Sequence, residues 1–82
     1  MTRRMHCRLQ ALIDAHNLAV ADGAPGVRLT QRAIADATGV ALTTINRLSQ
    51  NSATRLDYST VEKLCEFFSC ELSDLLVLRP EQ

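Results

Sequence analysis

Apolar residues in the first part of the chain recur at helical spacing. The positions i, i+4, i+7, i+8 and i+11 are held by Met5, Leu9, Leu12, Ile13 and His16. This pattern predicts an amphipathic helix over residues 2–18, with residue 21 as the alternative end. Residues 22–26, with the sequence DGAPG, then concentrate turn-forming residues, so the helix must end before them.

Two shorter helices are predicted in the middle of the chain. Thr30 can cap a helix over residues 31–38. The inward positions of this helix would be Ile34, Ala35 and Thr38. Gly39 ends it, and only two or three residues separate it from a third helix over residues 42–50. Two helices joined by so short a turn must meet at a steep angle.

The last third of the chain predicts two more helices. Ser59 and Glu62 fit a capping box, in which the serine caps a backbone amide and the glutamate reaches back, so a helix is expected to start at residue 59. Its apolar stripe has i, i+3, i+4, i+7 spacing and consists of Val61, Leu64, Cys65 and Phe68. A short fifth helix is predicted over residues 72–77.

The predicted fold is therefore all-α, a five-helix bundle in a single domain over residues 1–82. A chain of 82 residues is too short to bury two separate cores. Aromatic residues make up only 4% of it, so the core must consist mainly of Leu, Ile, Val and Ala, the usual material of helix packing.

Five residue types at fixed spacing mark the second and third predicted helices as a helix-turn-helix. Counted from Gln31, a small residue is fifth, glycine is ninth, and aliphatic residues are tenth, fifteenth and eighteenth: Ala35, Gly39, Val40, Ile45 and Leu48. The small residue lets the two helices cross closely, and glycine can adopt the left-handed conformation that turns the chain. The aliphatic residues fix the third helix to the core.

The third predicted helix presents one polar stripe. At about 3.6 residues per turn, Ile45 and Leu48 define its buried side. The opposite side carries Thr43, Asn46, Arg47 and Gln50. Arginine can pair with guanine, asparagine or glutamine with adenine, and threonine can offer a hydroxyl or methyl group, so this stripe is predicted to contact base edges in a major groove.

These residues resemble the Cro and phage-repressor-like helix-turn-helix family. That family commonly has Gln, Ala, Gly and Ile at the positions held here by Gln31, Ala35, Gly39 and Ile45. The resemblance continues through residues 56–76 and covers most of residues 29–78. It implies a five-helix bundle that inserts its third helix into the major groove, usually as a dimer on a roughly palindromic operator.

The resemblance also implies contacts with the DNA backbone. It would place Gln31 beside a phosphate at the start of the second helix, and Arg55 in the loop where the family makes backbone contacts. The full set of predicted backbone contacts is Gln31, Thr44, Asn51 and Arg55. Two features depart from the family: the connection over residues 19–28 is longer than usual, and Ala41 stands where Ser or Thr often caps the third helix.

Charge is distributed unevenly although the net charge is zero. Residues 1–56 hold seven arginines and three aspartates, a balance of +4, whereas residues 57–82 hold two basic and six acidic residues, a balance of −4. A polyanion would therefore bind to the first part of the chain.

The cysteines Cys7, Cys65 and Cys70 are predicted to be free thiols, because their number is odd and the N-terminus lacks the apolar run of a signal peptide. With His6 they would supply enough ligands for zinc, but Cys65 and Cys70 are spaced more widely than paired zinc ligands, and Cys65 lies on the apolar stripe. No metal site, cofactor or catalytic constellation is predicted, so the protein is expected not to be an enzyme.

The sequence thus predicts a cytoplasmic, sequence-specific DNA-binding transcriptional regulator, with repression as the expected mode. Its expected partners are double-stranded DNA and a second copy of itself, with a dimer surface near the aliphatic residues 75–78. No membrane or small-molecule partner is expected. A protein-binding module, or an antitoxin-like partner protein, is the alternative, because one fold can carry several functions.

Overall fold

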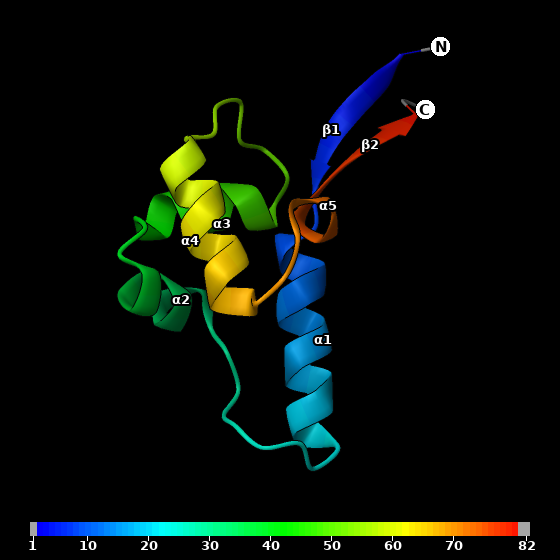
Figure 1. Cartoon of the computed structure of the whole chain (residues 1–82). Coiled ribbons are helices and arrows are strands. Elements are labelled where there is room, and N and C mark those ends of the chain that lie inside the picture. Colours follow the sequence, from blue (N-terminus) through cyan, green and yellow to red (C-terminus); the bar gives the residue numbers. More distant parts are fainter. Residues whose placement is uncertain (1, 81–82) are drawn as a thin grey trace.

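The computed structural model describes residues 2–80, which form a helical bundle with two paired strands at one end (Figure 1). The elements are β1 (Arg3–Cys7), α1 (Leu9–Ala21), α2 (Gln31–Thr38), α3 (Leu42–Ser49), α4 (Tyr58–Phe68), α5 (Leu72–Leu75) and β2 (Leu76–Pro80). The two strands project from the bundle beyond the start of α1. Within residues 2–80, no helix has the length and apolar character needed to span a membrane.

One cluster of apolar side chains forms the core. Each of the five helices contributes one fully buried residue to it: Leu9, Ile34, Ile45, Leu64 and Leu75. Around these lie the further buried residues Cys7, Ile13, Val40 and Leu48. Burial of one such aliphatic side chain contributes about 1.5–3 kcal/mol, so this cluster is the main source of stability. The predicted inward positions on α2, α3 and α4 are confirmed at Ile34, Ile45, Leu48 and Leu64.

The prediction of an all-α fold is wrong at both ends of the chain. Residues 3–7, expected in the first helix, form β1, and the predicted fifth helix stops at Leu75, where β2 begins. Polar and apolar side chains alternate strictly from Arg4 to Leu9, and a period of two residues is that of a strand. Met5 and Leu9 are four residues apart, a spacing that fits both a helix and this alternation. Met5 is 58% exposed in consequence, whereas Leu9 is buried.

The strands β1 and β2 form an antiparallel ribbon in which Cys7 pairs with Leu76 and Arg4 with Arg79. Cross-strand partners lie on the same side of such a ribbon and successive residues on opposite sides. One side, here called the Met5 face, consists of Arg3, Met5, Cys7, Leu76, Leu78 and Pro80. The other side, here called the Arg4 face, consists of Arg4, His6, Val77 and Arg79.

The predicted helix caps have different outcomes. The hydroxyl of Thr30 caps α2 as predicted, by accepting a hydrogen bond from the amide of Ala33. The capping box predicted at Ser59 and Glu62 is wrong, because α4 already begins at Tyr58 and places Ser59 inside its first turn. A capping box is present instead at the start of α5, formed by Glu71 and Asp74.

The long connection between α1 and α2 is fixed to α1 by side chains. Asn17 forms two hydrogen bonds with the backbone of Leu29, accepting from its amide at 2.7 Å and donating to its carbonyl at 3.0 Å. A ring nitrogen of His16 lies 2.9 Å from the carbonyl oxygen of Val27. These contacts order the end of the connection, from which α2 starts.

The turn between α2 and α3 depends on the backbone conformation of Gly39. Its φ of 78° is left-handed, and its amide donates to the carbonyl of Ala35 at 2.9 Å. Among the described residues, nothing would lie within 4 Å of an added Cβ atom. The need for glycine at this position is therefore conformational and does not come from crowding.

We expect Gly39→Val to lower the free energy of unfolding by about 1–2 kcal/mol, because a β-branched residue is strongly disfavoured at positive φ. Gly39→Asn is the matched control, since asparagine tolerates this conformation, and it should cost much less. Thermal unfolding followed by circular dichroism measures both. Equal melting temperatures for the Val and Asn variants would contradict the conformational explanation.

Candidate nucleic-acid interface

The polar stripe predicted on the third helix is exposed in the structure. Ile45 and Leu48 turn into the core, with exposed fractions of 0% and 2%. The four predicted base-contacting residues, Thr43, Asn46, Arg47 and Gln50, are all exposed. Gln50 lies just beyond the last helical residue, Ser49, because α3 is one residue shorter than predicted. The stripe is thus a continuous polar surface along α3 and its C-terminal cap.

The first residue of α2 is joined to this stripe. The side-chain amide of Asn46 donates a hydrogen bond to Oε1 of Gln31 at 3.2 Å. Gln31 is half-buried, and it follows the Thr30 cap at the N-terminus of α2. The contact brings a predicted base-contacting residue and a predicted backbone-contacting residue together, and it limits the orientation of both side chains.

Arg47 contributes to the lining of two hollows in this surface. One, of about 270 Å³, is lined by Leu42, Thr43, Asn46 and Arg47. The other, of about 240 Å³, is lined by Thr44, Arg47, Ser52, Ala53, Thr54 and Arg55. The second hollow brings together Thr44 and Arg55, two of the predicted backbone contacts, and its lining is largely polar. The Arg47 side chain is therefore shared by two hollows, one lined by residues of α3 and one that extends to the loop after it.

Leu42, which lines the first hollow, was not among the site residues predicted from the sequence. Leu42 is the first residue of α3 and remains 38% exposed. An exposed aliphatic side chain is the type of group that packs against a thymine methyl group in helices that do contact bases. Leu42 is three residues before the buried Ile45, and this helical spacing suggests a buried side chain. Its exposure could therefore not be predicted from the sequence.

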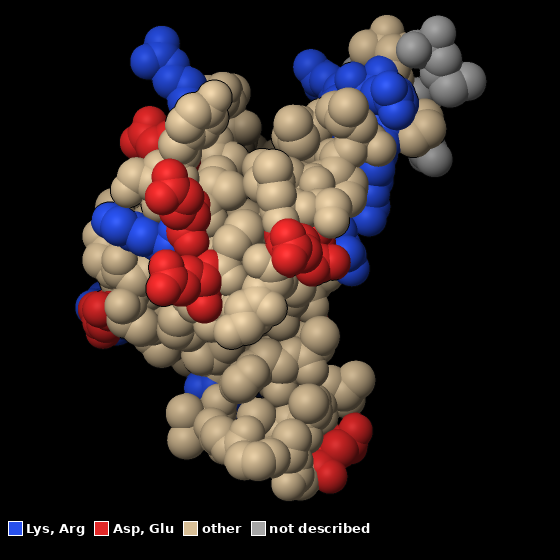
Figure 2. Space-filling view, viewed as in Figure 1, with Lys and Arg blue, Asp and Glu red and all other residues tan. Residues whose placement is uncertain are grey.

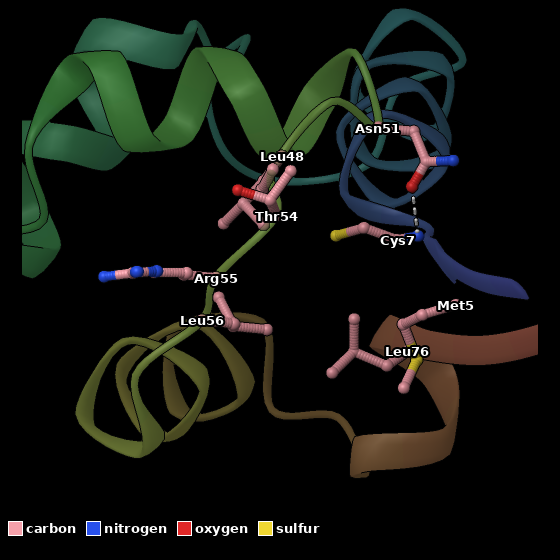
Figure 3. Close-up of a pocket in the computed structure, with 9 residues that line it drawn as sticks. Met5, Cys7, Leu48, Asn51, Thr54, Arg55, Leu56 and Leu76 are labelled. Atoms are coloured by element: carbon pink, nitrogen blue, oxygen red, sulfur yellow. Dashed lines mark hydrogen bonds between the residues drawn. The ribbon is translucent and has the colours of Figure 1, made fainter.

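Asn51 connects the end of α3 to strand β1. Its φ of 57° is left-handed, and the hydrogen bonds from its amide to the carbonyl of Leu48 and from the amide of Ser52 to the carbonyl of Arg47 form a Schellman motif. Its Oδ1 accepts a hydrogen bond from the amide of Cys7 at 2.9 Å, as Figure 3 shows.

The other end of the Asn51 side chain faces β1 as well. Its Nδ2 lies 3.1 Å from Nδ1 of His6. Both polar groups of this side chain therefore have partners within the protein, and the predicted contact of Asn51 with the DNA backbone stays a prediction. Its contacts with β1 could not be anticipated from sequence, because the two segments are more than 40 residues apart.

An apolar cavity of about 140 Å³ lies next to this junction. Its lining includes Met5 and Cys7 of the ribbon, and Leu48, Leu56 and Leu76 (Figure 3). Burial raises the pKa of the Cys7 thiol above its ordinary value, an effect that a hydrogen bond with the backbone of Leu9 partly offsets. Cys7 thus acts as a neutral packing residue. No group of three or more His, Cys, Asp or Glu residues within residues 2–80 is placed to hold a metal ion.

Charged side chains are unevenly distributed on the face that Figure 2 shows, but the grouping does not simply follow the two parts of the sequence, because the basic ribbon includes Arg79 of the second part. In Figure 2, acidic side chains lie over α4 and α5, and basic side chains gather along the ribbon. The two arginines of the interface, Arg47 and Arg55, are exposed, in the part of the chain with the positive balance.

The two helices joined by the left-handed turn at Gly39, with a polar stripe on the second of them, define a helix-turn-helix protein. The family model described as a Cro/C1-type HTH DNA-binding domain matches residues 27–81, and the chain belongs to this family. The resemblance seen in the sequence is thereby confirmed. Domains of this family bind DNA and are typically not enzymes. Comparisons with curated proteins and with solved structures found no match.

Substitution of Asn51 tests its double role at the end of α3. Asn51→Gly keeps the left-handed turn but removes the acceptor for the Cys7 amide, so we expect it to lower the free energy of unfolding by about 1–2 kcal/mol. Asn51→Ala should cost about 1 kcal/mol more, because alanine is strained at positive φ. In both variants the Cys7 amide should exchange with solvent deuterium faster. Unchanged exchange at Cys7 would contradict the assigned hydrogen bond.

Proposed function

We propose that this protein is a sequence-specific DNA-binding transcriptional regulator that inserts α3 into the major groove. The observation that carries the proposal is the exposed polar stripe of Thr43, Asn46, Arg47 and Gln50 on a helix whose opposite side is buried. An α-helix fits the major groove, where each base pair presents a distinct pattern of donors and acceptors.

The chemistry of the stripe suits base readout. Arg47 has a guanidinium that can donate two hydrogen bonds to O6 and N7 of guanine, and its central position allows it to reach the groove floor. Gln50 has an amide that matches the N6 and N7 groups of adenine. Asn46 can do the same, and its hydrogen bond to Gln31 holds it in place beforehand. Leu42 and Thr43 add apolar contacts for a thymine methyl group.

Contacts with phosphates would set the register of the protein on the duplex. The N-terminus of α2, with Gln31 as its first residue, offers backbone amides and the positive end of a helix dipole to a phosphate. Thr44 and Arg55 meet around one polar hollow beside Arg47 and suit a second phosphate. Asn51, at the point where the chain leaves α3, is also proposed to contact the DNA backbone.

We also propose that the protein binds as a homodimer. Leu75, part of the predicted dimer surface, is fully buried and belongs to the core. We therefore place the dimer surface on exposed residues that lie near Leu75 in space. A groove of about 300 Å³ with a mainly apolar lining is formed by Leu56, Tyr58, Val61, Glu62, Leu72 and Leu76. Tyr58 is 87% exposed and Leu72 is 55% exposed, and neighbouring exposed apolar side chains typically mark an interaction site. A second copy would cover both and create two-fold symmetry.

Repression, by occupation of an operator, and a cytoplasmic location belong to the same proposal, and both depend on the proposed DNA partner.

Substitutions of the two interface arginines should separate base readout from backbone binding. Arg47→Ala should cost about 1–3 kcal/mol on the preferred duplex and much less on mixed-sequence DNA, so discrimination falls. Arg55→Ala should weaken both duplexes similarly and lower the slope of log K against log salt by roughly one unit, so discrimination remains. Fluorescence anisotropy at several salt concentrations measures both quantities.

If the two variants weaken every duplex equally, α3 does not contact bases and the sequence-specific hypothesis fails. If neither variant changes binding to any duplex, a protein-binding role on the same fold becomes the better account. The stripe on α3 should then be tested against a protein partner.

A further inference from the structure

Two cysteines lie at the junction of α4 and α5, away from the polar stripe of α3. Cys65 is in the last turn of α4, and Cys70 is in the short connection that leads to α5 (Figure 1). Both are free thiols and half-buried, whereas the third cysteine, Cys7, is only 8% exposed. A small reagent in solution can therefore reach the thiols at this junction more easily than the thiol of Cys7.

The backbone at the end of α4 brings these two cysteines together. Ser69 ends the helix with a left-handed φ of 52°. The amide of Cys70 donates a hydrogen bond to the carbonyl of Cys65 at 2.9 Å. The amide of Ser69 donates to the carbonyl of Glu66 at 3.2 Å. This pair of bonds is a Schellman motif, in which the side chains of the two outer residues commonly contact each other. Here the two outer residues are both cysteines.

The surroundings of the Cys70 thiol agree with this placement. Burial raises its pKa above the ordinary value, and the neighbouring Cys65 raises that pKa further, through its charge and through a hydrogen bond between the two side chains. The carboxylates of Asp74 and Glu71, which form the capping box of α5, contribute less in the same direction. At neutral pH Cys70 is therefore a neutral thiol. Because the thiolate is the nucleophile, its reactions should accelerate as the pH rises.

We propose that Cys65 and Cys70 form a reversible intramolecular disulfide, with a small-molecule disulfide as the oxidant. The thiolate of one cysteine attacks a sulfur of the oxidant, breaks its S–S bond and releases one small thiolate, which leaves a mixed disulfide on the protein. The thiolate of the other cysteine attacks the protein sulfur of this mixed disulfide and releases the second small thiolate. Two cysteine thiols are thus oxidised and one small disulfide is reduced, and the two cysteine protons end on the two small thiols.

Inert packing is the competing interpretation, because Cys65 lies against the core. The disulfide is favoured by the partial exposure of both thiols and by the turn, which already holds them together and makes the second step intramolecular. A reversible bond is also the form that disulfides usually take in a reducing compartment. A metal site is not favoured, since no group of three or more His, Cys, Asp or Glu within residues 2–80 is placed to hold an ion.

The test treats the folded protein with hydroxyethyl disulfide, a neutral oxidant, and its thiol at pH 8. Remaining thiols are then alkylated, and the chain is cleaved after glutamates, which separates the two cysteines at Glu66. We expect one linked pair of peptides that contains Cys65 and Cys70, and no mixed disulfide. The oxidised protein should melt about 5 °C or more above the reduced protein, because the bond restricts the unfolded chain. Reduction should reverse both changes.

Two single substitutions are the matched controls. Cys70→Ser and Cys65→Ser each leave one half-buried thiol without its partner, so each should stop at the mixed disulfide and show no such rise in melting temperature. In Cys65→Ser, formation of the mixed disulfide at Cys70 should accelerate about tenfold from pH 7 to pH 8, as expected for a thiol whose pKa lies above this range.

A wild-type protein that stops at the mixed disulfide, while both variants also react, would overturn the proposal, because the thiols would then be accessible but not aligned. A disulfide to Cys7 or between two copies would overturn it as well. No reaction of the folded wild-type protein even at pH 9 would favour inert packing. These outcomes are independent of DNA binding, so the proposed function and this inference can fail separately.

Discussion

The burial of Ile45 and Leu48 determines which side of α3 faces solvent, and the rest of the interface depends on it. Both residues share one core cluster with Ile34 of α2, so the rotation of α3 about its axis is fixed by hydrophobic packing. The polar stripe is the remaining surface of that helix. Gly39 makes the packing possible, because its left-handed conformation reverses the chain between the two helices within three residues. Specific contacts with DNA would therefore be oriented by core residues that never touch it.

A second constraint acts where α3 ends. Asn51 terminates the helix with a left-handed backbone and uses its side chain to hold β1, so one residue joins the helix-turn-helix to the ribbon. The ribbon brings Cys7 and Leu76 to the core on its Met5 face, and this leaves its Arg4 face outward. Only the inner end of the Met5 face, at Cys7 and Leu76, contributes to the core, while the outer end of the ribbon is exposed on both faces.

Local patterns predicted the central part of this fold well and its ends poorly. The bounds of α2, the Thr30 cap and the turn at Gly39 followed from residues close together in the sequence. The ribbon did not, because its strands are stable only when residues 3–7 pair with residues 76–80, and the alternating residues 4–9 also fitted a helix. The exposed positions of the stripe were predictable from helical period, whereas the contacts of Asn46 with Gln31 and of Asn51 with Cys7 required the tertiary structure.

The most direct test of the central claim, that α3 distinguishes base sequences, is enrichment of duplexes from a random DNA pool by the wild-type protein. Binding of two symmetric copies predicts a motif of two inverted half-sites, with centres separated by about 10–10.5 base pairs or a multiple of one helical turn. A single half-site would retain base readout and contradict only the dimer. A bound pool with no sequence preference would contradict the claim itself.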